Sequence, residues 1–591
     1  MLSWFRWKTA LAERLSTQLG VTISADEIVV PPDRTFGDFA FACFRLAKER
    51  GISPVQLAKE AADAFDEVGL DVASVSAQGP YVNFTLATDL SVASVVREVE
   101  SAGTAYGHWP QQSGAPTLFE YANPNTHKDI HVGHLRMLLL GLSVVRIAKA
   151  AGQQIIPISF VNDLGNNVAK CLWQLVNDAG CDPATLTNVQ EAKKILASIA
   201  SDKHNGKFLA EVYVAATNAL EANETLKEKV SFVQHQLEVH APAWEYLWRE
   251  TRQWCLDELF AIFREIGIEL DHQYLESEVI DRSIEIVDEL VQKNVATTSQ
   301  GALIVDLEDK KLGAALIRKT DGTHLYLTKD LALAEVKFED YPTIARSVVM
   351  TDDRQALHFR QLAEILKRMG VTKPYEFFGY GLVVLKDGAM SSRKGNIVTY
   401  QAVREAMIAY ARGEIVARHA DWSETKIAHT SWSIAMAGMK FAVLKQDPNA
   451  LLTFDLQQSL SFDGATGPYC QYAATRMASI LRKAGCDEVT LSSWKHEELS
   501  NCFDHRSEKN LCFVMAELPM RIEQAARESR PSVIAQWCVD LSQAINDWYR
   551  DVKILDAPED MRSGKLRLAA AARQSLAVGL ELLAIEVPEE M

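Results

Sequence analysis

The segment from residue 117 to residue 161 constrains the fold of this chain more than any other. Residues 117–122 and 154–161 are short apolar runs of the kind found in strands, and residues 132–150 between them have apolar side chains at helical spacing. We expect an amphipathic helix between two strands. Strand, helix and strand within this length are typical of a parallel βαβ unit.

Strand-like runs return far downstream, at residues 302–306, 347–351 and 380–385. We expect these late segments to complete the same sheet. The intervening residues, about 164–300, are highly charged and mostly helical in pattern, which predicts an insertion outside the sheet. The predicted fold class is therefore α/β, with a Rossmann-type nucleotide-binding domain that carries helical insertions.

The rest of the chain has a different character on each side of this domain. The N-terminal part mixes helical and strand patterns with Pro- and Gly-containing turns, which predicts an α+β domain, and a Gly/Pro/Ser-rich linker follows it. From about residue 400 onward the pattern is helical. We predict an α+β domain at 1–110, the Rossmann-type domain at 111–400, a connecting helical region at 401–460 and an all-α domain at 461–591.

Charge and cysteine content exclude several classes of protein. The net charge of −17 argues against a polybasic protein that coats membranes or DNA, although a local basic face could still bind a nucleic acid. The nine cysteines include no CxxC pair, so no zinc framework is visible. The chain has no apolar run of about 18–20 residues, so we expect a soluble cytoplasmic protein with no membrane partner. From the charge and the cysteine pattern we expect no DNA partner and no metal caged by the side chains.

The first chemical motif is HVGH at residues 131–134, between the first strand and its helix. A helix N-terminus offers free N–H groups and a positive dipole end to phosphate. Gly133 lets a flat ligand approach the backbone, and His131 and His134 share one side of the turn, where they can hydrogen-bond phosphate oxygens. Alone, the motif could equally be two surface histidines, whereas a zinc pair would need another spacing and a third ligand.

The second motif occupies residues 390–396, after a late strand. It consists of Met390, Ser391, Ser392, Arg393, Lys394, Gly395 and Asn396. Small hydroxyl residues followed by two cations and a glycine can clamp a pyrophosphate leaving group. An isolated motif of this kind is more often a solvated basic turn, and its place after a late strand is what favours the catalytic interpretation.

Together these motifs resemble the signature pair of class I aminoacyl-tRNA synthetases, and the finer match is to the arginyl-tRNA synthetase family. The matching segments run in order along the whole chain: GDFA at 37–40, GPYVNF at 79–84, FEYANPN at 119–125, VNDLGN at 161–166, RKTDGT at 318–323, LYLTKDLA at 325–332, QALHF at 355–359 and TGPYCQY at 466–472.

The resemblance implies an arginine–tRNA ligase. Such an enzyme uses ATP, which arrives with Mg²⁺, to join L-arginine to tRNA(Arg) through an arginyl-adenylate, releasing AMP and pyrophosphate. The N-terminal domain would contact tRNA, the C-terminal helical domain would bind the anticodon, and the family is mostly monomeric, so we expect a monomer. The open alternatives are a non-catalytic tRNA-binding paralogue, a class I synthetase for another amino acid and a free-standing nucleotidyltransferase.

A site that selects arginine needs carboxylates, because a guanidinium is always charged and offers a planar fork of donors. Asp330 follows Tyr326 by four residues, so on a helix both face the same side. By resemblance Tyr326 lies along the arginine side chain, Asp330 pairs with the guanidinium, Glu120 is a further acceptor, and Asn125 and Gln355 hold the α-amino and carboxylate end. The alternative is a core Tyr326 and an Asp330 that caps a helix.

The second motif departs from the class pattern Lys-Met-Ser-Lys-Ser. Ala389 and Ser392 stand where the class has lysines, so Arg393 and Lys394 are expected to supply the charge. Lys128, three residues before the first histidine, is a second candidate, with an exposed loop lysine as the alternative of equal weight.

Residues that contact tRNA are predicted at two places. Gln78, Tyr81 and Asn83 flank the turn at 79–80 and could stack on and hydrogen-bond an unpaired base. In the C-terminal domain, Arg476 and the run from Trp548 to Arg550 combine aromatic rings with cations, and Tyr549 could stack on an anticodon base. In both places the alternative is that the aromatic residues belong to the core.

Overall fold

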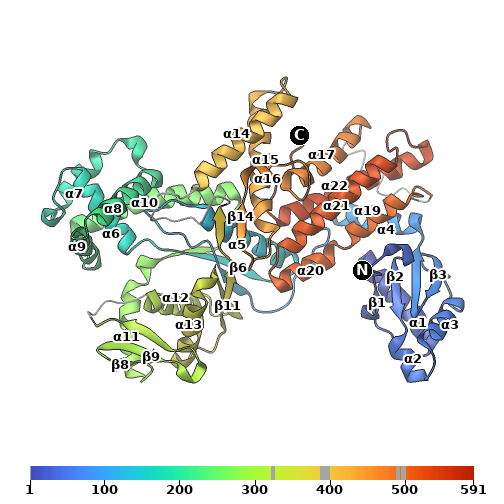
Figure 1. The fold of residues 1–591 in the computed structure, drawn as a ribbon, viewed down its shortest axis with the longest axis horizontal. Helices are drawn as coiled ribbons and strands as arrows, with labels where there is room; N and C mark the ends of the chain where they lie inside the picture. The colour runs from blue at the N-terminus through green and yellow to red at the C-terminus, as the bar shows by residue number, and fades with distance from the viewer. Residues whose placement is uncertain (1, 321–325, 386–398, 487–492, 494–498, 500) are drawn as a thin grey trace.

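The computed structural model describes residues 2–591 except 321–325, 386–398, 487–492, 494–498 and 500 (Figure 1). Five parallel strands form the central sheet, in the order β12 (Tyr375–Tyr380), β11 (Arg346–Asp352), β5 (Thr117–Glu120), β6 (Ile155–Val161) and β7 (His272–Leu275). The chain runs outward from β5 to β7 and then returns to the other side of β5, so the strand order reverses between β5 and β11. In such sheets ligands bind at the carboxyl ends of the strands near this reversal.

Helix α5 (Val132–Ala150) joins β5 to β6, which confirms the predicted βαβ unit. The predicted amphipathic character is wrong, because 15 of its 19 residues are buried. One side of α5 contacts the sheet and the other contacts the C-terminal helices. The packing of α5 against Tyr121, the residue after β5, is so close that a Cβ on Gly141 would lie 2.2 Å from the Tyr121 ring.

Two of the late strands belong to other sheets than predicted. Residues 302–306 form β9 (Ala302–Asp306), which pairs antiparallel with β8 (Thr297–Ser299) and β10 (Ala314–Arg318). Its buried and less buried residues alternate, as expected for a sheet with one solvated face. In the predicted strand at 380–385, β12 ends at Tyr380, and Val383–Leu385 is a separate strand, β13, that pairs with β14 (Leu452–Phe454).

The predicted insertion at 164–300 contains one strand of the central sheet, the four-residue β7, which sequence reasoning missed. Before β7, five helices form a body with its own hydrophobic core, at the left of Figure 1. They are α6 (Asn166–Asp178), α7 (Val189–Ala197), α8 (Gly206–Ala222), α9 (Leu226–Glu238) and α10 (Pro242–Ile266). After β7 come α11 (Ile280–Gln292), α12 (Tyr326–Asp340) and α13 (Ala356–Met369).

The N-terminal region is an antiparallel sheet with helices, at the lower right of Figure 1. Its strands are β1 (Ile28–Val29), β2 (Phe39–Ala42), β4 (Tyr81–Leu86) and β3 (Val72–Gln78), in that order, and its helices are α1 (Ser3–Leu19), α2 (Phe44–Arg50), α3 (Pro54–Asp63) and α4 (Thr88–Ala102). It docks on the C-terminal helices through ion pairs such as Lys509 Nζ to Asp38 Oδ2, at 2.5 Å.

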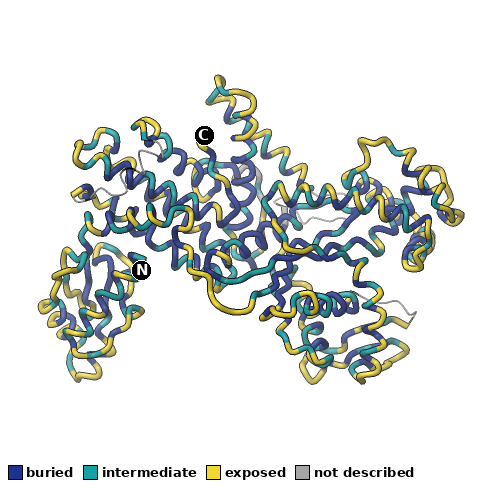
Figure 2. The backbone as a smooth tube through the Cα atoms, turned by 180° about the vertical axis from the view of Figure 1, so that it is seen from behind, coloured by how far each residue is buried: buried dark blue, intermediate teal, exposed yellow. Residues whose placement is uncertain are grey.

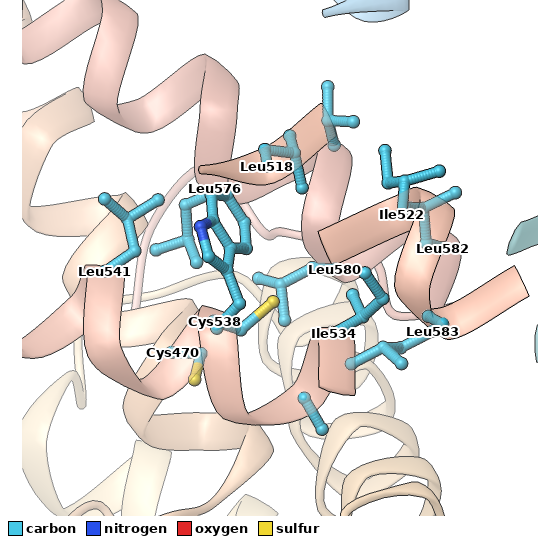
Figure 3. Close-up of a cluster of buried hydrophobic side chains, with 14 of the residues drawn as sticks. Cys470, Leu518, Ile522, Ile534, Cys538, Leu541, Leu576, Leu580, Leu582 and Leu583 are labelled. Atoms are coloured by element: carbon cyan, nitrogen blue, oxygen red, sulfur yellow. The ribbon is translucent and has the colours of Figure 1, made fainter. Parts of the chain in front are cut away.

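The C-terminal region is helical and carries a continuous apolar core. Its helices include α14 (Tyr400–Arg418), α15 (Glu424–Leu444), α16 (Leu456–Ser459), α17 (Gly467–Lys483), α19 (Arg506–Ala516), α20 (Leu518–Glu528), α21 (Ser532–Asp551) and α22 (Glu559–Leu582). Figure 3 shows Cys538 and Leu541 of α21 and Leu576 of α22 among the buried apolar side chains of this core. Buried residues also run along the central sheet, whereas the outer surface of the helical insertion is exposed (Figure 2). Among the described helices, none has both the length and the apolar character needed to cross a bilayer.

Candidate active site

The two histidines of the HVGH motif begin helix α5 at the carboxyl edge of the sheet. His131 is the residue that caps the helix, and its Nδ1 accepts a hydrogen bond from the N–H of Gly133 at 3.1 Å. The N–H of His131 in turn donates to Nδ1 of His134 at 3.3 Å, and the two rings stack with centroids 3.8 Å apart. Because both Nδ1 atoms accept, each neutral ring carries its proton on Nε2 and can donate it to a ligand.

Burial keeps both rings neutral at physiological pH. It lowers the pKa of His131 to about 4, with a smaller contribution from the charge of Lys128, and it lowers the pKa of His134 far below its usual value. Burial, followed by repulsion from Lys170, also lowers the pKa of Lys128. The histidines can therefore donate hydrogen bonds but do not bring positive charge to the site.

The predicted pyrophosphate loop lies outside the described residues. It includes Met390, Ser391, Ser392, Arg393 and Lys394. The residues on both sides of it are tied to the start of α5. Thr399 forms a bridge with His131, and the N–H of Tyr400 donates to the carbonyl of Ile130 at 2.7 Å. On the other side the carbonyl of Leu382 accepts from Arg136 of α5 at 3.0 Å.

Helix α12 carries two of the residues predicted to bind arginine. Tyr326 is its first residue and is 69% exposed, so the alternative of a core tyrosine is wrong. Asp330 lies in the next turn, where it cannot cap the helix, and its Oδ2 is 2.6 Å from Nε2 of His358. Gln355 is exposed at the end of the short turn Asp353–Gln355 that precedes α13.

Glu120, the last residue of β5, is almost fully buried at 3% exposure. One carboxylate oxygen accepts from Nδ2 of Asn123 at 2.7 Å, and the other forms an ion pair with Nζ of Lys337, a fully buried residue of α12. An arginine guanidinium at Glu120 would have to share a carboxylate that already has two partners. Asn125 pairs with Asn162, which joins the segments that leave β5 and β6.

Three family models match the chain in order. The catalytic domain of class I tRNA synthetases (R) matches residues 111–455, the arginyl tRNA synthetase N-terminal domain matches 6–86, and the DALR anticodon-binding domain matches 470–591. The arginine–tRNA ligase of Bdellovibrio bacteriovorus is 32% identical over 575 residues, which cover 95% of this chain and 94% of that protein. The chain belongs to the arginyl-tRNA synthetase family of class I.

Further comparisons agree with this family. The arginine–tRNA ligase of Lactococcus lactis subsp. lactis is 31% identical over 98% of both chains. The arginyl-tRNA synthetase of Thermus thermophilus shares the fold, with a TM-score of 0.76 over 99% of this chain and 100% of that one, at 24% identity.

Two buried residues shape the site of this family member and were not predicted. Asp163, in the VNDLGN segment, accepts from the N–H and Oγ of Ser277 at 2.8 and 2.7 Å and from Arg252 at 3.0 Å, so it ties the end of β6 to the end of β7. His127 is fully buried, and its Nε2 lies 2.9 Å from Oγ1 of Thr251 in α10. Burial lowers the pKa of His127 to about 3. A buried His four residues before a motif gives no signal of its role in sequence.

The predicted tRNA-facing residues differ in exposure. Gln78 is exposed, and Tyr81 is 39% exposed and packs edge-on against the ring of Phe44, so Tyr81 is not a core residue. Asn83 is 4% exposed in the middle of β4 and does not reach the surface beside Gln78 and Tyr81.

Tyr549, on α21, is 46% exposed and is likewise not a core residue. The guanidinium of Arg476 lies over the rings of both Tyr549 and Tyr472, at 4.9 and 4.8 Å.

Proposed function

We infer that this chain attaches L-arginine to tRNA(Arg) in an ATP-dependent reaction through an arginyl-adenylate, with release of AMP and pyrophosphate. It is an arginine–tRNA ligase. The observation that carries this conclusion is the match of residues 111–455 to the arginyl class I catalytic domain, between N- and C-terminal domains of the same family.

We propose that ATP binds at the start of α5. The carboxylate of arginine attacks the α-phosphorus and pyrophosphate leaves, so the protein positions the reactants and stabilises charge without a covalent nucleophile. The Nε2–H groups of His131 and His134 donate to phosphate oxygens, and Gly133 lets the nucleotide approach the backbone. Since both rings are neutral, the positive charge comes from Lys128, Arg393 and Lys394 and from Mg²⁺ that arrives with ATP.

Mg²⁺ is proposed to arrive as part of the nucleotide substrate, where it would neutralise charge on the phosphates. Within the described residues, no group of three or more His, Cys, Asp or Glu side chains is arranged to hold a metal ion. Met390, Ser391 and Ser392 are proposed to hold the pyrophosphate end together with the two cations that follow them.

For the amino acid, we propose that Asp330 binds the guanidinium and that the exposed ring of Tyr326 lies along the side chain. Asn125 and Gln355 hold the α-amino and carboxylate groups. Glu120, which already pairs with Lys337, shapes the inner wall of the pocket and accepts hydrogen bonds.

For tRNA, we propose that the N-terminal domain contacts an unpaired base through Tyr81 and Gln78, with Asn83 supporting the strand from within. The helical domain at 461–591 binds the anticodon loop, where Tyr549 stacks on a base. We propose that one monomer carries out the whole reaction.

Arginine-dependent exchange between ATP and labelled pyrophosphate tests this function, measured with and without tRNA(Arg) and with lysine and glutamine as controls. Exchange that requires arginine supports the assignment. Exchange with another amino acid contradicts the arginine pocket. If no amino acid supports exchange while tRNA still binds, the chain is a non-catalytic paralogue.

A further inference from the structure

Three charged residues of α12 each pair with a different element around the proposed arginine pocket. Lys337 pairs with Glu120 at the end of β5, and Lys329 pairs with the buried Glu276 that follows β7. In both pairs an ammonium neutralises a carboxylate. Asp330 differs, because its partner is an imidazole, that of His358.

This difference decides which carboxylate can attract a cationic side chain. Glu120 and Glu276 each have a lysine against them, so each pair adds no net charge to the pocket. The partner of Asp330 is not a lysine ammonium but an imidazole, whose Nε2 offers one hydrogen bond to the carboxylate. A guanidinium needs a carboxylate that is not already occupied by a permanent cation. The Asp330 side chain is 19% exposed, so a ligand can reach it.

We propose that His358 is a positioning residue for arginine selection, which donates its Nε2–H to Oδ2 of Asp330 and thereby fixes the carboxylate in the orientation that receives the guanidinium. This inference rests on the proposed role of Asp330 in binding arginine. A carboxylate oxygen accepts more than one hydrogen bond, so the bond from His358 leaves acceptor capacity on both oxygens for the two parallel N–H groups of a guanidinium.

The position of His358 is itself well supported. It lies in the first turn of α13, next to Phe359, which is 7% exposed and stacks on Phe377 of β12 with ring centroids 5.4 Å apart. The His358 ring also packs edge-on against Phe359 at 5.1 Å. The helix that carries Asp330 starts with an exposed residue, Tyr326, whereas its partner is held by the sheet. Fixing the carboxylate before arginine arrives lowers the cost of ordering it on binding.

The experiment compares H358Q with H358N in the full-length enzyme. The two variants have the same neutral amide, but only the longer Gln side chain can bring an N–H donor to the place of Nε2. Aminoacylation of tRNA(Arg) gives kcat and the KM for arginine and for ATP, and thermal unfolding checks the fold of each variant.

We expect H358N to raise the KM for arginine about 10-fold, as for loss of a hydrogen bond to a charged group. The kcat, the KM for ATP and the melting temperature should stay close to those of the wild type. H358Q should restore the KM for arginine to within about 3-fold of the wild type, because its donor regains the bond. A KM for arginine that is equal in H358N and the wild type overturns the inference, as does an equal rise in both variants.

D330N separates this inference from the proposed function. If Asp330 binds the guanidinium, D330N raises the KM for arginine by about 100-fold or more, because a desolvated charge pair is lost. An unchanged KM in D330N overturns the arginine pocket and the role of His358 together. A large rise in D330N with no rise in H358N leaves the pocket standing and overturns the role of His358 alone.

Discussion

The proposed ATP side and the proposed amino-acid side of the candidate active site are built by different means. On the ATP side, α5 is buried over most of its length, and its two histidines hold each other through the backbone at the start of the helix. On the amino-acid side, α12 begins at the 69% exposed Tyr326. Its active-site face is held by the ion pair of Lys337 with Glu120 and by the contact of Asp330 with His358.

The contrast follows from what each side must recognise. A helix start binds phosphates through its free N–H groups. Apolar packing along the rest of the helix is enough to hold that start in position. A guanidinium requires carboxylates, and a buried carboxylate requires partners of its own. We therefore expect substitutions at the start of α5 to change chemistry, and substitutions in the polar pairs of α12 to change stability or the KM for arginine.

The largest effect is expected from the double variant H131A/H134A. Loss of both Nε2–H donors should slow adenylate formation by on the order of 10³-fold or more, because each donor acts on charge that develops on phosphate oxygens. Single-turnover formation of arginyl-adenylate, in the presence of tRNA(Arg), measures this step. Turnover near the wild-type rate would show that the ATP site lies elsewhere.

H127Q is the matched control for that variant. His127 lies in the same loop, but its ring contacts Thr251 and Thr126 inside the protein. Its substitution should lower the melting temperature while adenylate formation falls by less than about 10-fold, since only a structural hydrogen bond is lost. If H127Q slowed adenylate formation as much as the double variant does, a structural role for His127 could not be separated from the proposed phosphate-binding role of His131 and His134.

On the amino-acid side, K337M should be strongly destabilising. It leaves Glu120 buried without its cation, which costs about 3–5 kcal/mol. The double variant E120Q/K337M removes both charges and should recover most of that loss, because the desolvated pair itself adds little net stability. Urea unfolding, followed through the catalytic domain, measures the three proteins. Equal stability of K337M and the wild type would mean that the pair is not buried in solution.

These differences show which parts of the molecule could be read from the sequence. The βαβ unit is local, and the spacing of apolar residues predicted it. The HVGH motif is also local, and its residue types alone marked it as a candidate phosphate site. The pairing of Glu120 with Lys337 joins residues 217 positions apart, and no local pattern marks it. The strand at 302–306 was predicted correctly, but its sheet was not, because a strand pattern does not name the partner strand.

The buried face of α5 could not be predicted for a related reason. Its covering helices come from the C-terminal region, from α14 onward, and start 250 or more residues after α5 ends. Likewise, the four residues of β7 are too few for a periodic signal amid helices. The family resemblance identified Asp330 and Tyr326 as candidate arginine-binding residues. Only the structure shows that Asp330 contacts His358.

An intermediate effect is expected from D129N. This variant tests whether the buried charge of Asp129, on the proposed ATP side, destabilises the folded protein. Burial, with added repulsion from Glu258 and Glu211, raises the pKa of Asp129 to about 6. Its folded pKa exceeds its unfolded value near 3.8, so the charged form destabilises the fold above pH 6, and this cost disappears as pH falls towards 3.8. D129N should therefore stabilise the protein by on the order of 2 kcal/mol at pH 8.

Melting temperatures of D129N and the wild type between pH 8 and pH 5 measure this effect. The difference between the two melting temperatures should be largest at pH 8 and should decrease as pH falls through 6. If this difference does not change with pH, the stabilisation comes from packing. The charge of Asp129 would then not destabilise the fold.

The smallest effect is expected from Y326F, at the exposed start of α12. If the Tyr326 ring lies along the arginine side chain, the stacking surface does the binding, so Y326F should keep the KM for arginine within about 2-fold of the wild type. Y326L removes the aromatic face and should raise that KM by about 2- to 5-fold, as for an exposed cation–π contact. Because Tyr326 is 69% exposed, both variants should melt at the wild-type temperature. A melting temperature lowered in both would mean that this end of α12 is fixed by packing, as α5 is, and the contrast between the two sides of the site would not hold.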